Sequence, residues 1–131
     1  MKEFKMKAWL KKEKKMVAII GIDFNYEYIR YTEDGNLFNE NYKTADFKDV
    51  ELLQYIGMKD KNNNEIYEGD ILKLRDNHGI QLVKYYDEWS AFIVESQKDT
   101  SVGVLGLYFD KEDFEIIGNA YENSELLGEK E

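Results

Sequence analysis

The chain has 131 residues, a net charge of −9, 15% aromatic side chains, and neither cysteine nor proline. This length suits one domain with an ordinary core, and the absence of cysteine excludes a disulfide framework and favours a reducing cytoplasm. No apolar stretch is long enough to be a secretory signal or to cross a bilayer, so we expect no membrane association.

Charge is divided unevenly along the chain. Residues 1–15 contain seven lysines against two glutamates, and the remainder contains eleven basic and twenty-five acidic side chains. A basic tip of this kind could contact a phosphate backbone. The candidate nucleic-acid contacts are Lys11, Lys12, Lys14 and Lys15. Because apolar residues alternate with lysines before this tip, the outer face of a solvated hairpin explains the charge better.

Residues 1–44 predict two hairpins. We expect paired strands over Glu3–Trp9 and Met16–Phe24, followed by a second pair that turns at Asp34-Gly35. Asp-Gly between alternating runs favours a tight turn, since glycine adopts positive φ without steric cost.

Residues 45–131 predict a barrel-like part and a C-terminal segment. One helical turn is expected within Ala45–Val50 and another at Asn123–Leu127. Between residues 65 and 95, strands alternate with tight turns in the pattern of a small SH3-like meander. Gly69 is expected to introduce a bulge where the sheet curls.

The predicted fold class is mainly β. We expect an antiparallel meander or partly closed SH3-like barrel, with an additional N-terminal hairpin and one or two short helical turns. A single domain over residues 1–131 is expected, and no internal repeat is evident. Such barrels carry many unrelated functions, so the fold class alone predicts no activity.

Asp60 begins a loop that resembles the start of a calcium-binding loop, with oxygen donors at the first, third and fifth positions. The sixth position is Glu65 instead of glycine, and the twelfth is Ile71 instead of a bidentate glutamate. A hairpin turn is therefore the better interpretation, and we expect neither a metal nor a cofactor.

The sequence signals for a catalytic site are equally weak. His78 is the only histidine, and no nucleophile motif accompanies it. Glu68 and Asp70 flank Gly69, but a chain with twenty-seven acidic residues contains such pairs by chance. We expect Asp70 to accept backbone hydrogen bonds at the bend, and we expect no enzyme activity.

Aromatic side chains cluster on one predicted hairpin, at Tyr85, Tyr86, Trp89 and Phe92. Rings of this kind can stack nucleic-acid bases, but phosphates would need cations, and only Lys84 is near. Core packing or a protein interface is the better interpretation.

Four blocks of sequence stand in a distinctive order along nearly the whole chain. They are Met6–Met16, Asp49–Asn62, Glu65–Ile71 and Ile117–Leu127. Together they resemble the YopX-like family, which occurs in phages and prophages of Gram-positive bacteria. The chain departs from the family pattern at Leu10, Asn63 and Ser124, where Asp, Gly and Pro are usual. These departures affect turns and a helix start.

The resemblance implies a small, mostly β protein of uncharacterised function, with no catalytic or ligand residues to carry over. Its recurring residues fit structural roles: Trp9 as a buried anchor, Gly57 and Gly69 as bends, and Tyr67 packing across a hairpin. We call the full set the signature residues: Trp9, Gly57, Tyr67, Gly69, Asp70, Gly118, Asn119 and Tyr121.

We therefore expect a non-enzymatic phage or prophage accessory protein in the cytoplasm of the host bacterium. A β module that binds an unknown phage or host protein, and that forms homo-oligomers, is the leading hypothesis. The alternatives are nucleic-acid binding through the lysine-rich N-terminal hairpin and an acidic DNA mimic.

Overall fold

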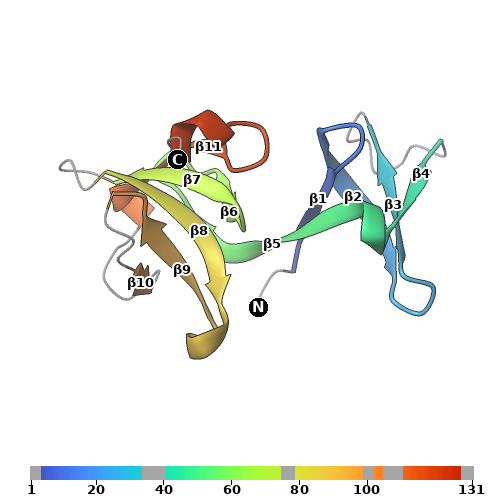
Figure 1. Cartoon of the computed structure of the whole chain (residues 1–131), viewed down its shortest axis with the longest axis horizontal. Helices are drawn as coiled ribbons and strands as arrows, with labels where there is room; N and C mark the ends of the chain where they lie inside the picture. The colour runs from blue at the N-terminus through green and yellow to red at the C-terminus, as the bar shows by residue number, and fades with distance from the viewer. Residues whose placement is uncertain (1–3, 34–40, 75–78, 99–101, 105–110, 128–131) are drawn as a thin grey trace. The chain divides into compact units, whose positions relative to one another are not determined.

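The computed structural model describes residues 4–33, 41–74, 79–98, 102–104 and 111–127, and regular structure within them consists of strands and short 3-10 turns (Figure 1). The strands are β1 (Met6–Leu10), β2 (Lys15–Asp23), β3 (Tyr28–Thr32), β4 (Lys43–Asp46), β5 (Val50–Lys59), β6 (Glu65–Tyr67), β7 (Asp70–Leu74), β8 (Ile80–Tyr86), β9 (Ala91–Ser96), β10 (Val102–Val104) and β11 (Phe114–Asn119). The 3-10 turns are η1 (Phe47–Asp49), η2 (Asp87–Trp89), η3 (Lys111–Asp113) and η4 (Ser124–Leu127). The described chain has no α-helix, which confirms the mainly β prediction.

The chain divides into two compact units. Residues 4–54 form the N-terminal unit, and the C-terminal unit begins at residue 55. The long strand β5 passes from one to the other: its first half pairs with β1 and its second half with β6. The expected single family domain, with its internal division at residues 44 and 45, stays a prediction.

In the N-terminal unit the strands lie side by side in the order β4-β3-β2-β1-β5, and all neighbours are antiparallel. Strands β1 to β4 form a meander, and the chain then crosses through η1 so that β5 pairs with β1. Alternation of apolar and polar residues places one face inward. The buried core consists of Ala8, Leu10, Val17, Ile29, Tyr31 and Val50.

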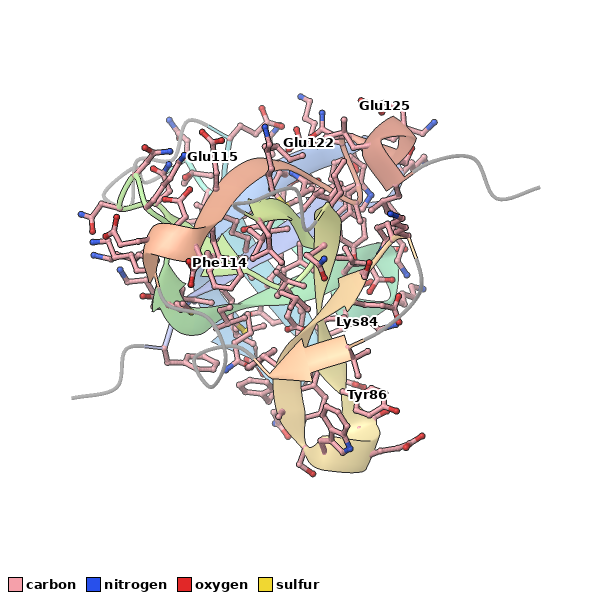
Figure 2. All side chains as sticks on the ribbon, turned by 90° about the vertical axis from the view of Figure 1, so that its left-hand side faces the viewer. Lys84, Tyr86, Phe114, Glu115, Glu122 and Glu125 are labelled. Carbon is pink, nitrogen blue, oxygen red and sulfur yellow. The ribbon has the colours of Figure 1, made fainter. Side chains whose placement is uncertain are left out.

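The C-terminal unit contains a five-stranded antiparallel sheet in the order β10-β9-β8-β7-β11. Strands β7 to β10 form a meander, and β11 follows η3 and pairs with β7. Its buried core consists of Ile66, Leu72, Leu74, Val83, Val94 and Phe114. Figure 2 shows the Phe114 side chain directed toward the interior of this unit.

The two units therefore share one connectivity: a four-stranded meander, a 3-10 turn and a fifth strand beside the first. Their registers also correspond, because Leu10 pairs with Val50 and Leu74 pairs with Phe114. Leu74 lies 64 positions after Leu10, and Phe114 lies 64 positions after Val50. No repeat is evident in the sequence, and the correspondence lies in topology alone, since strand register follows turn lengths and burial pattern rather than residue identity.

A second correspondence lies at the β2–β3 and β8–β9 turns. Each turn has four residues between the last paired positions, 24–27 in one unit and 87–90 in the other. The last residue of each turn is left-handed, with φ 56° at Glu27 and 48° at Ser90. The same turn geometry thus recurs with different side chains.

Both predicted helical turns are found, at η1 and η4, and the sequence missed η2 and η3. Strand β4 lies where the first helical turn was expected to begin. The predicted turn at Asp34-Gly35 and the histidine at position 78 lie outside the described residues. Among described residues the two edges of each unit's sheet do not pair with each other, so no closed barrel forms.

Candidate functional site

The signature residues of the C-terminal unit gather around Gly69, where the chain passes from β6 to β7. Gly69 has φ +85°, and its N–H donates to the Val83 carbonyl at 2.8 Å while its carbonyl accepts from Ala120 N–H at 2.7 Å. A Cβ at this position would lie 2.8 Å from the Tyr121 ring. Backbone conformation and the close approach of Tyr121 both require glycine here.

Asp70 fixes the start of β7. It is 7% exposed, and its Oδ2 accepts the Tyr67 backbone N–H at 2.8 Å. The Tyr67 ring packs against Tyr55, its cross-strand partner, with ring centroids 5.7 Å apart. Asp70 and Tyr67 thus hold the bend between β6 and β7.

Asn119 organises the chain after β11. Its Oδ1 accepts backbone N–H groups of Tyr121 and Glu122 at 3.0 and 2.8 Å, which closes an Asx-type turn. The Asn123 side chain accepts the Asn119 N–H at 3.1 Å, and a Cβ on Gly118 would lie 2.6 Å from that side-chain oxygen. These signature residues form a structural corner.

Two signature residues lie apart from this corner. Gly57 has φ +89°, and the pairing of β5 with β6 shifts register between Tyr55 and Lys59, so Gly57 lies at a bulge. Trp9 is only half-buried, because it lies on the opposite face of β1 from the buried Ala8 and Leu10. The expectation of a fully buried anchor at Trp9 needs this correction, and strand alternation is its physical reason.

Asp60, at the start of the loop that partly resembles a calcium-binding loop, is fully buried. Its Oδ1 accepts the N–H groups of Asn62 and Asn64, both at 2.9 Å, and its Oδ2 accepts Ile116 N–H at 3.0 Å. Burial alone would raise the pKa of this carboxyl, but the three backbone donors outweigh it and lower the pKa. Asp60 therefore ties its loop to β11.

The four candidate lysines lie at the β1–β2 turn, and all four are exposed. Lys11 Nζ donates to the Lys48 carbonyl at 3.2 Å and lies 3.6 Å from Glu51. Lys15 lies 3.9 Å from Glu33. Lys12 and Lys14 make no ion pair with another described residue, so their charges face solvent.

A cavity of about 310 Å³ lies beside this turn in the N-terminal unit. Its lining includes the cations Lys11, Lys12 and Lys48, the acids Glu13 and Asp49, and the Tyr31 ring. The equivalent place in the C-terminal unit, beside Leu74 and η3, holds only about 90 Å³. Because charges of both signs line the larger cavity, it has no clear preference for an anion or a cation.

The end of the β8–β9 hairpin combines exposed rings with carboxylates. Tyr85 and Trp89 are 43% and 50% exposed, and Asp87 and Glu88 in the turn are exposed as well. Tyr86 packs edge-on against Trp89, with centroids 4.9 Å apart, and Figure 2 shows Tyr86 near the end of this projecting hairpin. The Tyr86 hydroxyl donates to Glu88 at 3.2 Å, and this carboxylate raises the pKa of Tyr86.

The corresponding turn of the N-terminal unit is also aromatic. Phe24 and Tyr26 are 71% and 76% exposed, and the Phe24 ring packs edge-on against Phe47 at 6.0 Å. The Asp23 carboxylate accepts the Tyr26 N–H at 2.8 Å, so it serves the turn itself. The repeat thus presents aromatic rings at equivalent turns of both units.

Sequence reasoning identified the ring cluster of the second unit and weighed the neighbouring Asp87 and Glu88 as acids that disfavour nucleic-acid binding. It missed that these acids lie with Trp89 in η2, at the exposed end of the hairpin. Among described residues no cluster of three or more acidic, His or Cys side chains is arranged to hold a metal. No helix in the described part of the chain could cross a membrane.

Comparison with known proteins confirms the resemblance inferred from the sequence. A family model described as YopX protein matches residues 5–128. The structure resembles that of protein EF1440 from Enterococcus faecalis, with a TM-score of 0.61 and 24% identity over 97% of this chain and 99% of that one. It also resembles YopX from Bacillus subtilis, with a TM-score of 0.61 and 17% identity over 100% of both chains. No curated protein matches. At these identities the solved structures establish the fold, and the family model establishes that the chain belongs to the YopX family.

Proposed function

We propose that this protein is a non-enzymatic binding module of a phage or prophage, that it acts in the host cytoplasm, and that it associates with copies of itself. The observation that carries the proposal is the exposed aromatic end of the β8–β9 hairpin, with Tyr85 and Trp89. Tyr and Trp are enriched at protein interfaces, where they contribute large contact areas at low conformational cost. Family membership supports the phage origin.

We also interpret each unit as a partly closed SH3-like barrel. The edge strands β4 and β5 are joined by the three residues of η1 alone, so the sheet of the N-terminal unit must curl strongly at that end. Curled sheets leave turns at their ends, and these turns carry the exposed rings.

Sedimentation velocity over a range of protein concentrations tests self-association. We expect the sedimentation coefficient of the wild type to rise with concentration, and the rise to be reduced by Trp89→Ser. Tyr42→Ser is the matched control, because Tyr42 is 49% exposed and lies in the N-terminal unit. A wild-type chain that remains monomeric throughout would refute the self-association part of the proposal.

The nucleic-acid alternative rests on Lys12 and Lys14, whose ammonium groups make no ion pair with another described residue. It predicts binding of labelled duplex or single strands that weakens steeply with salt. Two open lysines are few for such a site, and the chain as a whole repels phosphate with its charge of −9. Fluorescence anisotropy at low salt should therefore detect no binding, and salt-dependent binding lost on Lys12→Gln/Lys14→Gln would favour the alternative. An acidic DNA mimic would instead bind a DNA-binding host protein.

A further inference from the structure

The β1–β2 turn is a compact basic surface on an acidic chain. Residues 11–15 are all exposed and contain four lysines against Glu13. Lys14 has φ 57°, and its N–H donates to the Leu10 carbonyl at 2.8 Å, so the turn backbone is fixed. Lys11 and Lys15 are engaged by carboxylates, which leaves Lys12 and Lys14 as the charges available to a partner.

The end of the β8–β9 hairpin has the opposite chemistry. Asp87 and Glu88 place two exposed carboxylates beside the Trp89 ring, and the residues from Tyr85 to Ser90 include no cation. The nearest lysine on the hairpin, Lys84, is paired with Glu95 at 3.2 Å. An ammonium group over the face of a tryptophan, flanked by carboxylates, gains both cation–π and ion-pair attraction.

We propose that the β1–β2 turn of one copy binds the end of the β8–β9 hairpin of a second copy, with Lys12 and Lys14 facing Asp87, Glu88 and the Trp89 ring. This inference rests on the self-association proposed above and specifies its surfaces. Charge complementarity selects the occupant, since the chain itself carries the basic surface that this acidic aromatic end would attract.

The equivalent turn of the N-terminal unit is a poorer acceptor for the same lysines. The Asp23 carboxylate there is used by the Tyr26 N–H, and the exposed Arg30 lies on the following strand. Only Glu27 remains as an exposed carboxylate within that turn. The second unit's turn has two exposed carboxylates, of which Glu88 also accepts the Tyr86 hydroxyl, and it combines them with the Trp89 ring and no cation, which is the better match for a pair of lysines.

The two surfaces differ, so each copy can make the contact twice, once through each surface. The contact can therefore close reciprocally in a two-fold dimer or continue from copy to copy into a larger ring or an open chain. Two turns bury little area, which makes the association weak and dependent on concentration. Added salt should weaken it, because the attraction is between exposed charges.

Charge reversal tests the contact directly. We expect Lys12→Glu/Lys14→Glu to abolish self-association in sedimentation velocity, and Asp87→Lys/Glu88→Lys to do the same. Mixing these two variants should restore association, because the basic turn of the second faces the acidic hairpin of the first, and the charge-reversed pair is complementary as well. The mixture should then associate as the wild type does, which also shows that both variants are folded.

Combining all four substitutions in one chain should restore self-association. Lys98→Glu/Lys111→Glu controls for net charge, since both lysines are exposed and lie outside the basic turn. Should the wild type associate while the reversed variants associate as strongly as this control, the proposed contact is refuted and self-association stands. Should the mixture yield no complex, or should the wild type be monomeric, the contact is refuted as well.

Discussion

The two units of this chain share strand order and register but fill their cores in different ways. At equivalent positions of the first and fifth strands, the N-terminal unit has Leu10 and Val50, and the C-terminal unit has Leu74 and Phe114. On the third strand the large residue is instead in the N-terminal unit, where Tyr31 is buried and Val94 occupies the corresponding place. The two core clusters therefore place a buried ring on different strands, Tyr31 on β3 and Phe114 on β11.

The difference shows that the same topology accommodates different residues at equivalent core positions. Interiors are packed as densely as organic crystals, so a larger residue on one strand must be offset by a smaller one nearby. Volume-conserving exchanges are tolerated best, and this permits two copies of one topology to diverge almost completely in sequence.

The largest effect is expected for Phe114→Ala. The ring is fully buried, and its loss should lower the free energy of unfolding by about 3–5 kcal/mol. Val50→Ala, at the equivalent position, removes fewer atoms and should cost clearly less. Because Trp9 lies in one unit and Trp89 in the other, variants that keep a single tryptophan report urea unfolding of each unit by fluorescence.

Phe114→Ala should shift the transition reported by Trp89 further than that reported by Trp9. Phe114→Leu is the control, and it should recover much of the loss because it restores most of the volume. Equal shifts of the transitions reported by Trp9 and Trp89 would mean that the two units unfold together. The comparison of the two units would then apply to their topology and not to their stability.

Asp60→Asn is expected to have the next largest effect. The carboxylate accepts three backbone N–H groups, and removing its charge should cost about 1.5–3 kcal/mol near neutral pH. The pKa of folded Asp60 lies below its ordinary value of 3.8, so the stabilisation is present above about that pH. It is lost as pH falls through the lower folded pKa.

The stability difference between wild type and Asp60→Asn should therefore be largest near neutral pH and shrink below about pH 3.8, in urea titrations at several pH values. Asp46→Asn is the matched control, since Asp46 is exposed and makes no side-chain cap to η1. A stability difference that stays constant across this pH range would indicate that asparagine destabilises the fold through its shape rather than through the loss of charge.

Much of the fold could be predicted from the sequence for physical reasons that act locally. Alternating apolar residues located β1 and β2 to within three residues, because period-two burial is a local signal. The repeat could not be predicted, because Leu10 and Leu74 coincide while most equivalent residues differ. Pairing between distant strands is set by the whole sheet, and a short window of sequence does not contain it.

Gly69→Ala and Gly57→Ala separate steric contact from backbone strain. Both glycines have positive φ, near +85° and +89°, so alanine is strained at either position by about 1 kcal/mol or more. Only at Gly69 would the new Cβ meet a neighbour, the Tyr121 ring at 2.8 Å, whereas nothing lies within 4 Å at Gly57. Gly69→Ala should therefore cost more in thermal unfolding, within about 1–3 kcal/mol.

The double variant Gly69→Ala/Tyr121→Leu tests the cause. Removing the ring should make the alanine at position 69 less costly than it is in the presence of Tyr121, a coupling that a double-mutant cycle measures. Additive costs would assign the whole effect to backbone strain.

The candidate site was only partly accessible to sequence reasoning. The pairing of Lys84 with Glu95 depends on which strand face each residue occupies, and this follows from sheet register. The exposure of Trp89 depends on the 3-10 turn η2 that contains it. The open charges of Lys12 and Lys14 depend on which neighbours engage Lys11 and Lys15, and those neighbours come from distant strands. Composition located the basic turn, and tertiary structure decided which of its lysines are free for a partner.

The smallest effect is expected for the Lys84–Glu95 pair on β8 and β9. Its atoms lie 3.2 Å apart, but the lysine side chain is 43% exposed, so the pair should contribute only about 0.2–1 kcal/mol. At the place equivalent to Lys84 the N-terminal unit has Gly21, against which the Arg30 side chain lies. One unit thus covers this part of the sheet with a salt bridge and the other with a single arginine. A double-mutant cycle with Lys84→Met and Glu95→Gln should give a coupling that falls as salt is added, because exposed pairs are screened. A coupling above that range, or one insensitive to salt, would mean that the pair is better shielded from solvent than its exposure indicates. This part of the C-terminal unit's sheet would then depend on charge in a way that the N-terminal unit does not.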